Sequence, residues 1–213
     1  TLLAIAACHC REQNAEREYF VVREKIVFSD KESGVELIAL PDDDFSLNVM
    51  ISYNSEVLDN QFAKLDSLNN FRKDIAPCRT FVFLHELEFL LNNNLVKGGD
   101  LDNAIVIMDR DVTQQELDRI ADLFHHEHIK LNGQKGILNN LKIHFSNEPA
   151  RHKLLDLVGD LTLVGKPIKG KIIATRPGHS SNVQFAKMLN KEMSKQFSKT
   201  AAPIYDADAE PVM

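Results

Sequence analysis

Residues 35–53, VELIALPDDDFSLNVMISY, hold two apolar runs separated by a turn-forming segment. Both runs are rich in β-branched and aromatic residues, which favour strands, whereas PDDD has the composition of a turn. Two shorter runs of the same kind precede them, EYFVV at 18–22 and KIVF at 25–28. We therefore predict an antiparallel meander over residues 19–53.

Helical periodicity dominates the rest of the chain, where short strands alternate with longer helices. Thr80 suits a helix N-cap, because apolar residues recur at helical spacing after it. Thr113 and Glu116 have the spacing of a capping box, and Pro149 suits the first turn of a helix. The expected helices are 80–94, 113–124, 148–161 and 181–197, and the expected short strands are 103–108, 141–145 and 170–175.

Strands early in the chain and longer helices later are typical of an α+β fold. We expect a two-layer sandwich, in which helices cover a mainly antiparallel sheet, with a small βαβ-like insert at about residues 80–112. Residues 19–197 would form this domain. Residues 1–18 would be a remnant of a preceding domain or linker, and residues 198–213, which show no period, would be a linker.

The composition excludes several classes of protein. The chain has 213 residues, of which 44% are hydrophobic, and a net charge of −6, which argues against nucleic acid or an anionic membrane as its main partner. No apolar run approaches the roughly 20 residues that a membrane span needs. Three cysteines (Cys8, Cys10 and Cys78) are an odd and sparse set, which indicates a reducing compartment and no disulfide framework.

Residues 148–161, EPARHKLLDLVGDL, carry a polar stripe along one face of their expected helix. His152, Asp156 and Asp160 follow one another at four-residue intervals, so each lies about 40° from the last around the helix. Zinc binds imidazole nitrogen and carboxylate oxygen, and a catalytic zinc usually has three protein ligands. His152 and Asp156 are therefore candidate ligands, although their spacing also suits an ordinary surface hydrogen bond. The third ligand is not evident.

Two further residues are candidates for the same site. His179 lies in RPGH, a connection between a strand and a helix, and functional groups collect in such loops. The alternative is a turn histidine that bonds the backbone or the start of the next helix. Lys153 follows His152 and could hold an anionic substrate group, although most lysines are simply solvated.

Two histidine-containing segments are weaker candidates. HHEHI at 125–129 lacks the H-E-x-x-H spacing of zinc proteases and follows a helix end, where histidine is common. CHC at 8–10 is too tight for three ligands to share one tetrahedral ion comfortably. We assign a metal to neither segment.

Four segments together resemble the second half of the bacterial UDP-3-O-acyl-N-acetylglucosamine deacetylases. They are APCRTFVFLHELEFL (76–90), LVKGGDLDNAIV (95–106), EPARHKLLDLVGDLTLVG (148–165) and RPGHSSN (176–182). The resemblance spans about residues 16–195. The last residues, APIYDADAEPVM (202–213), are similar to the linker of fused forms in which a hydroxyacyl-carrier-protein dehydratase follows.

The resemblance implies a cytoplasmic, zinc-dependent hydrolase of lipid A synthesis in a Gram-negative bacterium, whose substrate is UDP-3-O-acyl-N-acetylglucosamine with its fatty acyl chain. His152 and Asp156 would bind Zn²⁺. His179, oriented by Asp160, would be the charged general acid or the electrostatic partner of the tetrahedral intermediate, and Thr80 would contact the oxyanion or the substrate carbonyl. The implied substrate-binding residues are Phe81 and Lys153 at the sugar and diphosphate, Phe83, Leu87 and Val96 along an acyl passage, and Gly99.

The sequence departs from the family in one respect. The family's other zinc histidine and its glutamate base form a Glu-His pair on a helix of an earlier half, and Glu127 and His128 lack the right flanks to replace it. We therefore expect a fragment with little activity of its own. Two alternatives stay open: a non-catalytic module that binds nucleotide sugar and acyl chain, and a scaffold for a fused dehydratase.

Overall fold

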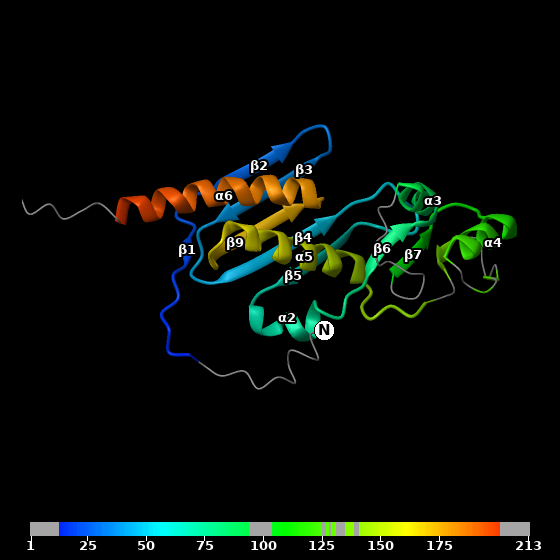
Figure 1. Ribbon diagram of the computed structural model, residues 1–213, viewed down its shortest axis with the longest axis horizontal. Helices are drawn as coiled ribbons and strands as arrows, with labels where there is room; N and C mark the ends of the chain where they lie inside the picture. Colours follow the sequence, from blue (N-terminus) through cyan, green and yellow to red (C-terminus); the bar gives the residue numbers. More distant parts are fainter. Residues whose placement is uncertain are drawn as a thin grey trace, which may run out of the picture.

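A six-stranded sheet forms one layer of the molecule in the computed structural model, which describes residues 13–93, 104–124, 127, 129–130, 135–138 and 141–200 (Figure 1). Five strands follow the order β2-β3-β9-β4-β5, and β1 pairs with the beginning of β9. The strands are β1 (Phe20–Val21), β2 (Ile26–Asp30), β3 (Val35–Leu40), β4 (Phe45–Ile51), β5 (Gln61–Leu65) and β9 (Ile168–Thr175).

The central position of β9 makes the predicted meander wrong. β2 with β3, and β4 with β5, are antiparallel pairs, but β9 lies between β3 and β4. It runs antiparallel to β3 and parallel to β4. The local pattern of residues 35–53 identifies two strands correctly, but it cannot reveal that a strand from far along the chain separates them, because alternation sets the buried face and not the neighbour.

The sequence analysis also missed one strand and predicted another that is absent. The segment 61–65 is a strand that the sequence analysis did not identify, since Gln61 and Lys64 interrupt its apolar residues. The segment 141–145 is not a strand. There the N–H of His144 donates to the Glu148 carboxylate, at 2.6 Å, and not to a neighbouring strand.

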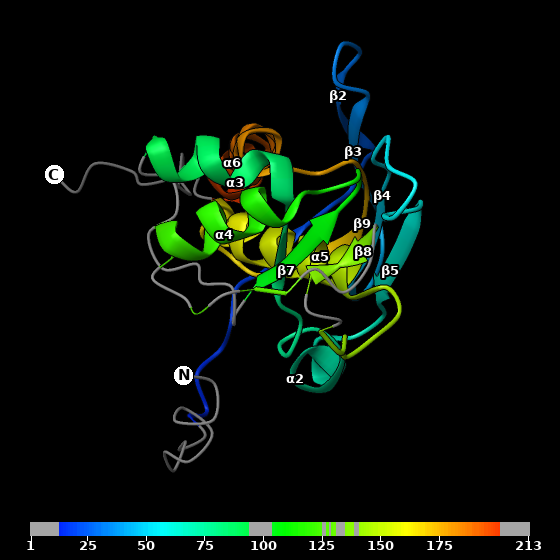
Figure 2. The ribbon, with the colours of Figure 1, turned by 90° about the vertical axis from the view of Figure 1, so that its right-hand side faces the viewer.

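Helices α5 (Glu148–Leu161) and α6 (His179–Thr200) cover one face of the sheet, as Figure 2 shows almost edge-on. Pro149 lies in the first turn of α5, as predicted. Met50 and Phe62, on the outer side of β4 and β5, are 43% and 51% exposed. The predicted α+β sandwich with helices on one face is confirmed. The core between the layers includes Leu37, Leu47, Ile172, Leu154, Leu157, Phe185 and Leu189.

The insert is a second, smaller sheet at one end of the molecule (Figure 1). β6 (Thr80–Phe83), α3 (Leu84–Asn92) and β7 (Ala104–Met108) form a βαβ unit, because β6 and β7 are parallel. It continues through α4 (Gln114–Leu123), which begins with the predicted capping box, to β8 (Gly136–Ile137), antiparallel to β7. Its own core contains Leu84, Leu87, Val106, Met108, Leu117 and Ile120.

Short helical turns complete the chain: η1 (Leu68–Asn70), α2 (Phe71–Asp74) and η3 (Thr162–Val164). Thr80 begins β6 and is not a helix N-cap, so that prediction was wrong; the helix starts only at Leu84. α6 continues to Thr200, three residues into the stretch predicted as a linker. No helix of the described residues is long and apolar enough to cross a membrane.

Several sequence predictions concern residues outside the described part of the chain. They include Val96 and Gly99 of the implied substrate-binding set, and Cys8 and Cys10. Most of the histidine-rich segment at 125–129 and the proposed linker from residue 201 onward also lie there.

Candidate active site

The polar stripe of α5 is longer than the sequence analysis recognised. Glu148 precedes His152 by four residues and is completely buried, so the stripe comprises Glu148, His152, Asp156 and Asp160. The apolar face of the helix packs Leu154, Leu157 and Leu161 into the core. Because the apolar face is fixed by the sheet, the stripe must face the start of β6 and the first turn of α6, which supply its hydrogen-bond partners.

His152 and Asp156 form a close pair on this stripe. Nε2 of His152 lies 3.3 Å from Oδ1 of Asp156, and their side chains are only 16% and 12% exposed. Nδ1 of His152 lies 3.2 Å from the carbonyl oxygen of Cys78. A carbonyl only accepts, so this bond places the proton on Nδ1 and leaves the Nε2 lone pair available on the side of Asp156.

Lys153 contributes a positive charge to the same carboxylate. Its Nζ donates to Oδ2 of Asp156 at 3.1 Å and lies 5.7 Å from the centre of the Phe81 ring. Phe81 in turn meets Tyr53 edge-to-face, with ring centres 5.5 Å apart. The structure therefore brings the implied sugar-binding residues next to the implied metal ligands.

His179 reaches the stripe from the first residue of α6. Its Nδ1 lies 2.9 Å from Oδ2 of Asp160, and its Nε2 lies 4.0 Å from Oδ2 of Asp156. The imidazole is 68% exposed. The two histidines thus approach one carboxylate, that of Asp156, from different helices.

The turn before His179 is conformationally unusual. Arg176 has a φ of 52°, the only positive value among the described residues other than glycine. Its N–H donates to the carbonyl of Met50 at 2.8 Å, and its Nε donates to the carbonyl of Ser52 at 2.9 Å. Such sparsely populated backbone conformations persist where surrounding contacts impose them, and they cluster at functional sites.

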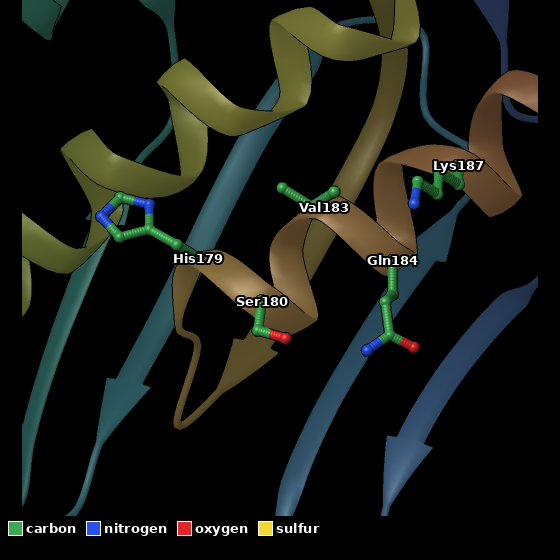
Figure 3. A pocket seen from close by; sticks show the side chains of 5 residues that line it. All are labelled: His179, Ser180, Val183, Gln184 and Lys187. Atoms are coloured by element: carbon green, nitrogen blue, oxygen red, sulfur yellow. The ribbon is translucent and has the colours of Figure 1, made fainter.

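A shallow surface pocket of about 660 Å³, open to solvent, lies beside His179 (Figure 3). It is lined by His179, Ser180, Val183, Gln184 and Lys187, all from the first turns of α6. The candidate acid therefore has open space next to it.

Thr80 is held near the stripe by its neighbours in the chain. Arg79 donates to the Glu148 carboxylate from its backbone N–H and its Nε, both at 2.9 Å. Burial alone would raise the pKa of Glu148, but these bonds and the one from the His144 N–H outweigh it and lower the pKa. The threonine itself is exposed. The ionised glutamate at the start of α5 therefore fixes the beginning of β6, where Cys78 and Thr80 lie.

Two other groups of the site have shifted pKa values. Burial raises the pKa of the Cys78 thiol to about 11, so it is neutral and unreactive at neutral pH. Burial also raises the pKa of the Tyr53 hydroxyl, and the carboxylates of Glu86 and Asp156 raise it further. Both side chains therefore contribute neutral groups to the wall around the charged stripe.

Phe83 and Leu87, the implied acyl-binding residues, are buried in the structure. Phe83 is 6% exposed and lies edge-on to Tyr53 at 5.5 Å, and Leu87 is 3% exposed in the core of the insert. The described residues do not place them on an open groove. Their contact with an acyl chain stays a prediction.

Sequence reasoning missed Asn182. This residue is completely buried, and its Nδ2 donates to Oδ2 of Asp160 at 2.8 Å. It follows His179 by three residues in HSSN, so both lie on the face of α6 that meets Asp160. That spacing was the available signal, but an asparagine in a helix is too common to be singled out without knowing what it faces.

The described residues do not form a complete metal site. No group of three or more histidine, cysteine, aspartate or glutamate side chains lies close enough there to hold an ion. His152 and Asp156 nevertheless suit one edge of a tetrahedral site. Two ligands at about 2.0–2.1 Å from zinc are separated by roughly 3.3–3.4 Å, close to the distance observed between Nε2 and Oδ1. The bond from Nδ1 to a backbone carbonyl is the usual second contact of a metal-binding histidine.

A family model described as UDP-3-O-acyl N-acetylglycosamine deacetylase (LpxC) matches residues 2–133 and 125–191. The chain belongs to this family. The resemblance found in the sequence is thereby confirmed. The match begins at residue 2, earlier than the start near residue 16 that we expected.

Curated relatives extend this result. The chain is 48% identical over 202 residues to the bifunctional enzyme LpxC/FabZ of Bacteroides thetaiotaomicron and 47% identical to that of Porphyromonas gingivalis, covering 95% of this chain and 43% of each relative. It is 36% identical over 155 residues to the UDP-3-O-acyl-N-acetylglucosamine deacetylase of Chlamydia pneumoniae, covering 72% of this chain and 46% of the relative. The chain thus spans less than half the length of these relatives.

Proposed function

We propose that this chain is the second half of a zinc-dependent deacetylase that hydrolyses the N-acetyl amide of UDP-3-O-acyl-N-acetylglucosamine in lipid A synthesis. The observation that carries the proposal is the approach of His152 and His179 to Asp156, at 3.3 and 4.0 Å, in a chain of this family. Its relatives include deacetylases with this substrate in their name.

His152 and Asp156 would hold the zinc through Nε2 and Oδ1. The third ligand and the general base would come from the remainder of the full-length protein. When bound, the ion would polarise the amide carbonyl and supply a water of lowered pKa. The Cys78 carbonyl would keep His152 in the tautomer whose Nε2 faces the ion.

His179 would donate a proton to the leaving amine. Amide hydrolysis needs an acid for the nitrogen that departs, because an amine anion is a poor leaving group. Asp160 accepts from Nδ1 at 2.9 Å, which directs Nε2 toward the space beside Asp156. The exposure of the imidazole is consistent with a group that must reach a bound substrate.

The surrounding residues would recognise the substrate. Lys153 and Phe81 would contact the sugar and diphosphate, and the exposed Thr80 would hydrogen-bond the carbonyl oxygen as negative charge develops there. Phe83, Leu87 and Val96 would line the passage of the acyl chain through the insert, and Gly99 would also contact the substrate. Apolar burial of that chain contributes about 0.8 kcal/mol per CH₂ group, so the insert would dominate affinity for the long-chain substrate.

The full-length protein would also carry a dehydratase. Two of the relatives with the highest identity are bifunctional LpxC/FabZ enzymes, which we take as the pattern for this chain. Both activities would act in the cytoplasm on soluble steps of the same pathway. The residues after 200 would then join the two parts.

The test compares two purified proteins in one assay for release of acetate from UDP-3-O-acyl-N-acetylglucosamine. The complete reading frame that contains this chain should turn over the substrate and lose activity on treatment with a chelator. The 213-residue chain alone should be inactive. An inactive full-length protein that still binds the substrate would support the alternative of a binding module, and turnover by this chain alone would contradict the proposed division of the site.

A further inference from the structure

The histidine proposed as the acid is held by very few contacts. His179 is 68% exposed, so packing does not fix its ring. Its closest polar contact in the described part of the chain is Asp160, at 2.9 Å, and the next is Asp156, at 4.0 Å. The direction of its Nε2 therefore depends on how the Asp160 carboxylate is oriented.

A single oxygen of Asp160 accepts two hydrogen bonds. Oδ2 receives Nδ1 of His179 at 2.9 Å and Nδ2 of Asn182 at 2.8 Å. An aspartate carboxylate rotates easily, because its terminal torsion has broad wells. A second donor on the same oxygen restricts that rotation and keeps Oδ2 directed at the histidine.

Asn182 is well placed to impose this orientation. It is completely buried, and its backbone N–H donates to the carbonyl of Gly178 at 2.8 Å in the first turn of α6. The hydroxyl of Ser181 donates to the same carbonyl, also at 2.8 Å. The asparagine is therefore a rigid point next to a carboxylate and an imidazole that are not rigid by themselves.

The other end of the Asn182 amide carries an unusual feature. Its Oδ1 is buried and has no hydrogen-bond partner among the described residues. The amide cannot be reversed to relieve this, because a carboxylate only accepts and must face the nitrogen. A buried polar atom without a partner destabilises a fold, so core packing alone would favour an apolar side chain here.

We infer that Asn182 is a positioning residue, which orients Asp160 and through it His179, at a cost to the stability of the domain. The inference rests on the proposed function for its consequence in turnover. It concerns the arrangement of the acid and not the metal ligands. It also explains why a buried asparagine with an unpartnered oxygen occurs next to the site.

The test replaces Asn182 with leucine, which has nearly the same shape, in the full-length protein. Asn190→Leu is the matched control, since Asn190 is on the same helix and its Nδ2 donates to a backbone carbonyl, that of Val164, at 2.9 Å. Asn182→Leu should lower kcat about tenfold or more, a part of the 10²–10⁴-fold that a general acid contributes. KM should not rise, and the melting temperature should not fall. Asn190→Leu should lower the melting temperature and leave kcat unchanged.

A double mutant shows whether the effect passes through Asp160. If it does, Asp160→Ala with Asn182→Leu should have the same kcat as Asp160→Ala alone, because the two substitutions interrupt one chain of contacts. Additive losses would overturn the inference. So would wild-type kcat in Asn182→Leu, or a loss of kcat that follows a loss of folded protein. Asn182→Ala serves the same comparison where the leucine variant does not fold.

The ring signals of His179 in ¹H–¹⁵N spectra separate this inference from the proposed function. Loss of its oriented hydrogen bond should change the Nδ1 signal in Asn182→Leu and not in Asn190→Leu. That outcome supports the positioning role even if the full-length protein proves inactive, which would refute the proposed function alone. An unchanged Nδ1 signal would overturn the positioning role.

Discussion

Two histidines approach the carboxylate of Asp156, one at each oxygen. Nε2 of His152 lies 3.3 Å from Oδ1, and Nε2 of His179 lies 4.0 Å from Oδ2. The first histidine is on the same helix, one turn earlier, and the second comes from α6. Because they differ in burial and in the partner of Nδ1, the same residue type can serve two purposes here. The buried, carbonyl-bonded His152 suits a ligand, and the exposed, carboxylate-bonded His179 suits a group that exchanges protons.

This division predicts different effects for the two histidines in the full-length protein. His152→Ala should remove both bound zinc and turnover. His179→Gln should leave the zinc content unchanged and lower kcat by about 10²–10⁴-fold, the usual contribution of a general acid. Metal analysis of the purified proteins alongside a deacetylation assay measures both quantities. His144→Ala is the control, because that side chain is exposed and only the backbone N–H of His144 donates to Glu148. Loss of zinc in the His179 variant would contradict the division.

The ion pair between Arg79 and Glu148 should matter far more than the one between Arg110 and Glu116. The distances are similar, 2.9 and 2.8 Å, but Glu148 is fully buried and Glu116 is 39% exposed. Arg79→Ala leaves a buried carboxylate without its charged partner and should lower the free energy of unfolding by about 3–5 kcal/mol. Arg110→Ala should change it by about 0–1 kcal/mol. Urea titrations of the two variants measure the difference, and equal effects would show that Glu148 is not buried as described.

The same glutamate predicts a loss of stability in acid. The folded state lowers the pKa of Glu148 below its ordinary value of 4.5. Its contribution is therefore fully present above pH 4.5, the unfolded value, and disappears as the pH falls through the lower folded value. The free energy of unfolding should drop below about pH 4.5 in the wild type, and this slope should be smaller in Glu148→Gln. Denaturant unfolding between neutral and acidic pH tests it, and identical slopes would contradict the assignment.

Structural features that depend on residues close together in the chain were predictable from the sequence. The strands at 35–40 and 45–51, the capping box at Thr113 and the α5 stripe all follow from short-range patterns, and each is present in the structure. The family resemblance added the implied roles of His152 and His179, which stay predictions. These roles could not be derived from spacing alone, because the same spacing serves ordinary surface pairs.

The features that the sequence did not reveal depend on distant parts of the chain. β9 separates β3 from β4, although more than a hundred residues lie between β4 and β9. Glu148 is an acid in the first turn of α5, and only the fold brings its partner Arg79, 69 residues earlier in the chain, beside it. The family resemblance implies that Leu87 lines an acyl passage, but its side chain is buried in the core of the insert. A charge at Leu87 would therefore disrupt that core, so it is a poor test of an acyl passage.

Substitution by alanine at two glycines should change the free energy of unfolding in opposite directions. Gly159 lies inside α5, and a Cβ there would have no atom within 4 Å. Gly159→Ala should raise the free energy of unfolding by about 0.5–1 kcal/mol, because glycine has the higher conformational entropy in the unfolded chain. Gly170, in β9, has a φ of +153°, and a Cβ there would lie 2.7 Å from Cγ2 of Val22 and 3.0 Å from the carbonyl oxygen of Leu40. Gly170→Ala should therefore destabilise the protein, by about 1–3 kcal/mol as is typical of overpacking.

The Gly170 position also tests the topology of the sheet. The close approach of Val22 exists only because β1 pairs in parallel with the beginning of β9, at Phe20 and Ile168. Cγ2 and Cβ of Val22 would lie 2.7 and 2.9 Å from the new Cβ, so the whole side chain must be removed to relieve this contact. Val22→Gly combined with Gly170→Ala should therefore be less destabilised than the sum of the two single variants. Chemical denaturation of the four proteins gives the coupling energy. Strict additivity would mean that the chain at β1 does not pair with β9 at this point, and the arrangement of the first strand would have to be revised.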